Sequence, residues 1–188
     1  GTKLFCYVDE TGQDTLGVFF IVAVIVSSSD RQALIETLER IERVSGKGKV
    51  KWTKIRRPQR LAYIRAVLSE RLFLNSSYFS TYNGTKAYMA LTVLSTAKPI
   101  LAGAPGHLGS TVFVDGLPKS RLRWFGAELR RLSVRNSRVS GVRREEADSL
   151  MCLADAVAGF VRLALSGKDA EMTALFEQAC KQGYLRPA

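Results

Sequence analysis

Residues 3–26 read KLFCYVDETGQDTLGVFFIVAVIV, and this stretch decides the fold class. Residues 3–8 carry side chains that favour β-strands, residues 9–12 are turn formers, and residues 16–26 are an almost continuous apolar run. The run has about half of the roughly 20 residues that a membrane-spanning helix needs, and acidic residues precede it, so we expect neither a membrane span nor a signal peptide. The stretch predicts a β-hairpin whose second strand is buried.

The rest of the chain alternates between helical and β-type patterns. Apolar residues at helical spacing predict helices over residues 31–46, 58–74, 85–101, 117–132, 145–165 and 169–181. Short β-rich runs predict strands over residues 75–82, 111–114 and 134–142, the last of them at a sheet edge. The order β, β, α, α, β, α, β, α, β, α, α predicts one α/β domain over residues 1–188, a mixed sheet with helices on both faces and helices inserted after the second strand.

The composition excludes several classes of protein. The chain has 188 residues, 46% hydrophobic and 24% charged, which is typical of a globular domain and not of a disordered chain. Its three cysteines, Cys6, Cys152 and Cys180, are odd in number and lack metal-type spacing, so we expect neither a disulfide framework nor a zinc cluster, and a reducing cytoplasm fits best. The motifs of serine hydrolases and of P-loop nucleoside triphosphatases are absent from the sequence.

The charge points to a polyanionic partner. Lys and Arg number 28 against 17 acidic residues, a formal net charge of +11, and much of the excess lies in residues 46–60 and 119–144. Nucleic acid is therefore the expected partner, although a merely soluble basic protein would show the same balance. The candidate nucleic-acid contacts, with Trp52 able to stack on a base, are Lys49, Lys51, Trp52, Lys54, Arg56, Arg57, Arg121 and Arg123.

Three aspartates are candidate ligands for a metal ion. Asp155 lies in residues 150–160, a helix that is apolar nearly all round, where an unpaired carboxylate is costly and needs a metal ion, an arginine or a helix N-terminus beside it. Asp9 and Asp115 each end an apolar strand, and neighbouring strands would bring them together with Asp155. Oxygen ligands of this kind favour Mg²⁺ or Mn²⁺. Asp148 lies about two helical turns before Asp155 and either caps the helix or joins the edge of the metal site.

Three motifs resemble those of a known family. They are residues 9–12 (DETG) at the end of the first strand, residues 50–52 (VKW) after the first helix, and residues 153–159 (LADAVAG) in the late helix. The chain resembles, over nearly its whole length, the bacterial and phage family named domain of unknown function three thousand eight hundred. The resemblance implies a ribonuclease H-like fold of the retroviral-integrase superfamily, with Asp9, Asp115 and Asp155 as the carboxylates of the site.

Two positions depart from the family pattern. Cys152 stands where Gln is usual, and Lys49 stands where an acidic residue is expected before residues 50–52. If that acidic residue is catalytic in the relatives, this chain has weak activity or none.

The sequence therefore predicts a nuclease that hydrolyses phosphodiester bonds with two Mg²⁺ or Mn²⁺ ions. Asp9, Asp115 and Asp155 would be its catalytic carboxylates, and Lys51 would neutralise charge on the phosphate. The alternative is a catalytically inactive module of the same fold that binds nucleic acid or a protein partner. A sugar-kinase-like or actin-like ATPase is a weaker alternative, because 188 residues are too few for the two lobes of such a protein.

Overall fold

The computed structural model describes residues 1–103 and 106–188. The strands are β1 (Lys3–Thr11), β2 (Phe19–Ser27), β3 (Ser77–Asn83), β4 (Gly109–Asp115), β5 (Ser137–Val142) and β6 (Leu185–Pro187). The helices are α1 (Arg31–Ser45), α2 (Arg57–Val67), α3 (Tyr88–Ala102), α4 (Lys119–Arg131), α5 (Ser149–Leu165) and α6 (Ala170–Gln182). Apart from β6, the order of helices and strands is the one that the sequence predicts.

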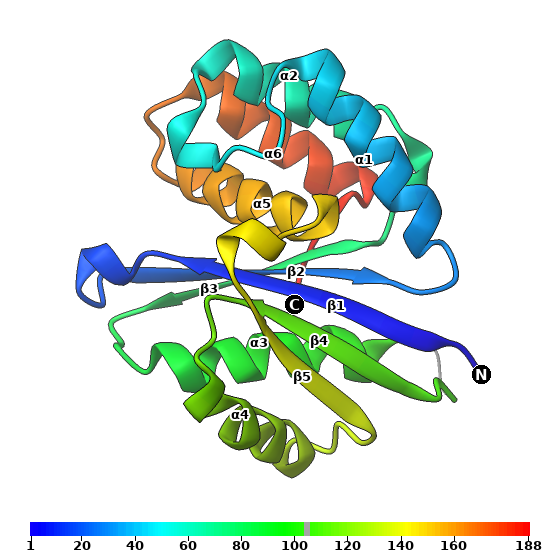
Figure 1. Cartoon of the computed structure of the whole chain (residues 1–188). Helices are drawn as coiled ribbons and strands as arrows, with labels where there is room; N and C mark the ends of the chain where they lie inside the picture. Colours follow the sequence, from blue (N-terminus) through cyan, green and yellow to red (C-terminus); the bar gives the residue numbers. More distant parts are fainter. Residues whose placement is uncertain (104–105) are drawn as a thin grey trace.

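The six strands form one mixed sheet in the order β5-β4-β1-β2-β3-β6 (Figure 1). β1 pairs antiparallel with β2, as expected for the hairpin, and β2 pairs antiparallel with β3. β1 pairs parallel with β4, and β4 pairs parallel with β5, which forms the predicted edge of the sheet. This arrangement places the ends of β1 and β4 side by side, where Asp9 and Asp115 lie.

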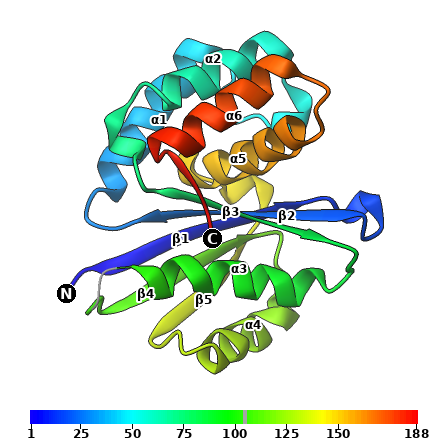
Figure 2. The same cartoon turned by 180° about the vertical axis from the view of Figure 1, so that it is seen from behind.

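Helices cover both faces of the sheet. The helices α1, α2, α5 and α6 lie on one face, and α3 and α4 lie on the other, as Figures 1 and 2 show from opposite sides. β2 alternates between the two cores, with Ile21, Ala23 and Ile25 packed toward the first group of helices and Phe20, Val22 and Val24 toward the second. Burial on both faces explains the unbroken apolar run of this strand.

The helix boundaries differ from the expected ones for local reasons. α2 ends at Val67 instead of residue 74, and a single 3-10 turn, Arg71–Phe73, follows it. α5 begins at Ser149 instead of residue 145, because the Asp148 side chain accepts hydrogen bonds from the backbone N–H groups of Leu150 and Met151 and so caps the helix there. β6 was not expected, and it pairs parallel with the outer edge of β3.

No single helix within residues 1–103 and 106–188 is long and apolar enough to cross a membrane. α5 and α6 reach the required length and hydropathy only as a pair, and a bend of 116° separates them.

Candidate active site

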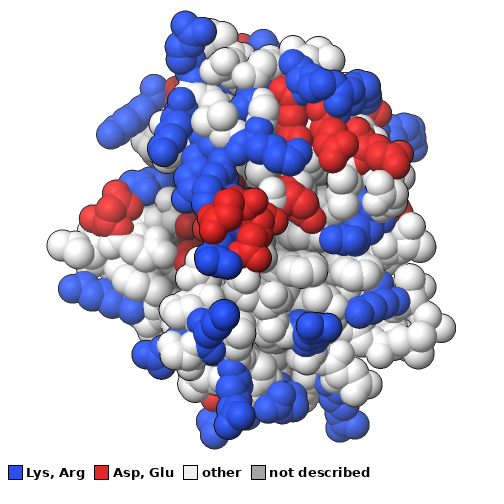
Figure 3. All heavy atoms as spheres, in the orientation of Figure 1, with Lys and Arg blue, Asp and Glu red and all other residues white. Residues whose placement is uncertain are grey.

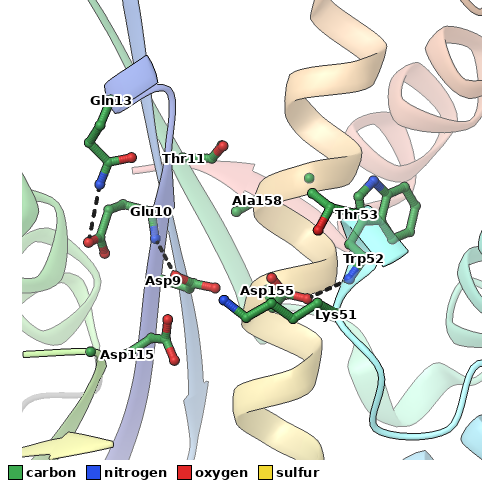
Figure 4. A pocket seen from close by; sticks show the side chains of 12 residues that line it. Asp9, Glu10, Thr11, Gln13, Lys51, Trp52, Thr53, Asp115, Asp155 and Ala158 are labelled. Carbon is green, nitrogen blue, oxygen red and sulfur yellow. Dashed lines mark hydrogen bonds between the residues drawn. The ribbon is translucent and has the colours of Figure 1, made fainter. Parts of the chain in front are cut away.

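Four carboxylates line one pocket of about 370 Å³ beside the ends of β1 and β4 (Figure 4). Asp9 and Glu10 come from β1, Asp115 from β4 and Asp155 from α5, and Lys51 extends among them. The pocket thus contains all three aspartates that the sequence analysis singled out for the metal site, together with the lysine assigned to the phosphate.

The register of the sheet explains why the carboxylates meet. Val8 pairs with Val114 in the parallel β1–β4 ladder, so the next residues, Asp9 and Asp115, lie side by side. α5 packs across β1 and β2 and brings Asp155 over the same end of the sheet. Asp9 and Asp115 therefore lie on adjacent strands with Asp155 facing them, as the sequence predicts.

Burial and the neighbouring negative charges make the carboxyl groups of Asp9 and Asp115 resist ionisation. Only 7% of Asp9 is exposed, and its pKa is raised well above the ordinary value by burial and then by the charges of Asp115, Glu10 and Asp155. Burial also raises the pKa of Asp115, although the nearby charge of Lys51 opposes this. A site with these properties gains free energy when a cation enters it.

Glu10 is a site residue that the sequence analysis did not assign. Burial, followed by the charge of Asp115, raises its pKa to about 7, and its Oε2 atom is buried without a hydrogen-bond partner among the described residues. Strand alternation sends Glu10 to the face opposite Asp9, which argues against a shared site. However, the β1–β4 ladder ends at Val8 while β1 continues to Thr11, so both faces of β1 are open to the pocket at this point.

Trp52 holds Asp155 and does not face solvent. The backbone N–H of Trp52 donates a hydrogen bond of 2.9 Å to Oδ2 of Asp155. The ring is 3% exposed and meets Phe160 edge-on, with 6.4 Å between the ring centroids. A Cβ atom on Gly159 would collide with this ring, so the glycine is required for the close approach. The expectation that Trp52 stacks on a base is therefore wrong.

Asp148 serves the helix and not the pocket. Its Oδ1 atom accepts the two capping hydrogen bonds of α5, and its Oδ2 atom accepts a hydrogen bond of 3.0 Å from the Tyr7 hydroxyl and lies 3.5 Å from Arg31. Asp148 does not line the pocket. We therefore correct its assignment as a metal ligand and retain the alternative role, that of helix cap.

Two of the candidate nucleic-acid contacts are bound to other side chains of the same chain. Arg57 forms ion pairs with Asp169 and Glu171, and Lys49 binds Glu42 at 3.0 Å and the Ser149 hydroxyl at 2.9 Å. These contacts weaken the case for both residues as phosphate ligands. Among the described residues, the candidates that form no ion pair are Lys51, Lys54, Arg56, Arg121 and Arg123.

The donor set fits a hard divalent cation in its chemistry. Four carboxylates supply only oxygen ligands, and the unpartnered Glu10 Oε2 is free to accept a further bond. In the positions described for residues 1–103 and 106–188, however, no three acidic, histidine or cysteine side chains are arranged to hold a metal ion. Binding one would require carboxylates other than Asp155 to rotate within the pocket, because the Trp52 N–H already holds Asp155.

Two solved ribonuclease structures have a similar fold. Ribonuclease H2 from Pyrococcus horikoshii OT3 aligns with a TM-score of 0.55 and 15% identity, over 83% of this chain and 70% of that protein. Ribonuclease HII from Archaeoglobus fulgidus, determined in complex with PCNA, aligns with a TM-score of 0.50 and 14% identity, over 96% of this chain and 90% of that protein. The chain therefore has a ribonuclease H-like α/β fold.

No family model and no curated protein matches the sequence. The resemblance to domain of unknown function three thousand eight hundred consequently rests on its three motifs alone.

Proposed function

We propose that this chain is a nuclease that hydrolyses phosphodiester bonds of nucleic acid with Mg²⁺ or Mn²⁺. The observation that carries the proposal is the convergence of Asp9, Glu10, Asp115 and Asp155 on one pocket of a ribonuclease H-like fold. Three of these carboxylates come from separate elements of the chain and repel one another, an arrangement that a purely structural role does not explain.

The four carboxylates of the pocket and Lys51 each have a role in this proposal. Asp9, Asp115 and Asp155 would supply oxygen ligands for the metal ions, and Glu10 would add a fourth carboxylate at the open end of β1. Bound Mg²⁺ or Mn²⁺ would lower the pKa of a water molecule and offset the charge of the leaving oxygen. Lys51 extends among the carboxylates, forms no ion pair within the described residues, and is placed to balance the negative charge of a phosphate (Figure 4).

Lys49, which departs from the family pattern, lies outside the pocket. Lys49 lies beside α1 and the start of α5, where it binds Glu42 and Ser149, and it is not among the residues that line the pocket. All four carboxylates are therefore in place despite the substitution. This observation favours the active nuclease over the inactive module of the same fold.

We place the nucleic-acid backbone along the N-terminal part of α4. A second pocket, of about 460 Å³, shares Gly116 with the carboxylate pocket. It is lined by Lys119, which forms no ion pair within the described residues, and by Arg143, which pairs with Glu145 and Glu146. Arg121 and Arg123 are exposed on the following turn of α4. Figure 3 shows Lys and Arg side chains spread over the part of this face that belongs to β5 and α4. Lys119, Arg121 and Arg123 offset the repulsion between a polyanion and the carboxylates.

Cleavage assays test the proposed activity. The protein is incubated with single-stranded DNA, duplex DNA, single-stranded RNA and a DNA–RNA hybrid, each with Mg²⁺, Mn²⁺ or EDTA. We expect cleavage of at least one substrate with a divalent ion and none with EDTA. Salt-sensitive binding without cleavage of any of the four would refute the nuclease and support the inactive binding module.

Replacing Arg121 and Arg123 by alanine tests the proposed path of the nucleic-acid backbone. The double change Arg121→Ala, Arg123→Ala is expected to weaken binding of all sequences alike and to reduce the slope of log affinity against log salt by roughly one for each lost phosphate contact. Arg57→Ala is the control. Because Arg57 is already paired with Asp169 and Glu171, its replacement should leave the slope unchanged. Fluorescence anisotropy at several salt concentrations measures both. If the double variant and the wild type show the same salt dependence of affinity, the nucleic-acid backbone lies elsewhere on the surface.

A further inference from the structure

Arg60, on α2, does not line the carboxylate pocket. It is hydrogen-bonded to Trp52, the residue that holds Asp155. Its Nε and Nη2 atoms donate hydrogen bonds of 3.1 and 2.9 Å to the carbonyl oxygen of Trp52. Its guanidinium group also lies over the Trp52 ring, 5.1 Å from the centroid. One planar side chain therefore restrains both the backbone and the side chain of Trp52.

Trp52 in turn contacts α5 at two neighbouring points. Its N–H donates to Oδ2 of Asp155, and its ring fills the space left by the missing side chain of Gly159. Asp155 and Gly159 are four residues apart, so they lie on the same face of the helix. Any movement of Trp52 along this face would shift the hydrogen bond on Asp155.

We propose that Arg60 is a positioning residue, which acts through Trp52 to hold Asp155 in the orientation that binds the metal ion. The N–H of Trp52 occupies Oδ2 of Asp155 and limits rotation of the carboxylate, which leaves Oδ1 available to a metal ion. Hydrogen bonds of this supporting kind typically change metal affinity by about 10- to 100-fold. The inference rests on the proposed function, because it requires Asp155 to be a metal ligand.

Isothermal titration calorimetry with Mn²⁺ measures the metal affinity of each variant and so tests this role without an activity assay. Arg60→Ala is expected to weaken Mn²⁺ binding by about 10-fold or more. Arg60→Lys keeps a cation and one donor for the Trp52 carbonyl, so its affinity should lie between those of Arg60→Ala and the wild type. Arg57→Ala, also on α2, removes exposed ion pairs with Asp169 and Glu171 and should bind Mn²⁺ as the wild type does.

The outcomes separate this inference from the proposed function. Wild-type affinity in Arg60→Ala, or an equal loss in Arg57→Ala, would overturn the positioning role and leave the nuclease proposal intact. A wild-type protein that binds no Mn²⁺ would overturn both. Thermal unfolding of each variant accompanies the titration, and the Arg60→Lys variant decides the question should Arg60→Ala fail to fold.

Discussion

Replacing Asp9 by Asn is expected to reduce metal-dependent cleavage by roughly 10²- to 10³-fold, the loss that follows removal of one preorganised electrostatic group from an active site. The same change is expected to stabilise the metal-free protein. Burial, followed by the charges of three other carboxylates, raises the pKa of Asp9, and an amide of the same shape avoids both costs. Initial cleavage rates and urea unfolding in EDTA measure the two effects.

An Asp→Asn change outside the pocket is the matched control. Asp14 lies close by in the chain, but its side chain is 67% exposed, pairs with Arg162 and does not line the pocket. Asp14→Asn should therefore cleave as the wild type does, with little change in stability. Wild-type cleavage by Asp9→Asn would exclude Asp9 as a catalytic carboxylate, and lost activity combined with lost stability would indicate misfolding instead.

The fold follows from the sequence where a pattern extends over many residues. β2 is apolar at every position from Phe19 to Val26, and the turn formers before it reveal the hairpin. β6 escaped prediction because its three residues, Leu185–Pro187, are too few for an alternating pattern and include a proline. It forms because the outer edge of β3 is available to pair with it.

Three of the four carboxylates of the site and Lys51 were predictable from the sequence, whereas Glu10 and the engagement of the surrounding cations were not. Asp155 stands out from the sequence because an acid in an apolar helix requires compensation, and Asp115 ends its strand as expected. Asp9 was also expected at a strand end, although β1 continues to Thr11. Which cations are free depends on distant partners. Arg57 is bound by Asp169, 112 residues further along the chain, and no local pattern reveals that pair. The burial of Trp52 likewise depends on Gly159, more than 100 residues away.

The metal-free protein is expected to lose stability as the pH rises from about 4.5 to about 7. Glu10 has an ordinary pKa of 4.5 when unfolded and a pKa of about 7 when folded, because burial and then Asp115 disfavour its charge. A raised pKa in the folded state contributes stability below the unfolded value, and that contribution is lost as the pH passes the folded value. The change corresponds to roughly 3 kcal/mol, since one pKa unit is worth about 1.4 kcal/mol.

A divalent ion should reverse this trend, because it binds the ionised carboxylates and not the protonated ones. Urea unfolding at pH 5, 6, 7 and 8 measures the pH dependence of stability in EDTA and in Mg²⁺. Mg²⁺ at 100 times its dissociation constant should add about 2.7 kcal/mol to the free energy of unfolding. Glu10→Gln keeps the size of the side chain but cannot ionise, so its stability in EDTA should fall less between pH 5 and 7. The same pH dependence in Glu10→Gln and the wild type would show that Glu10 does not titrate in this range, and a pH trend unaffected by Mg²⁺ would argue against a metal site at these four carboxylates.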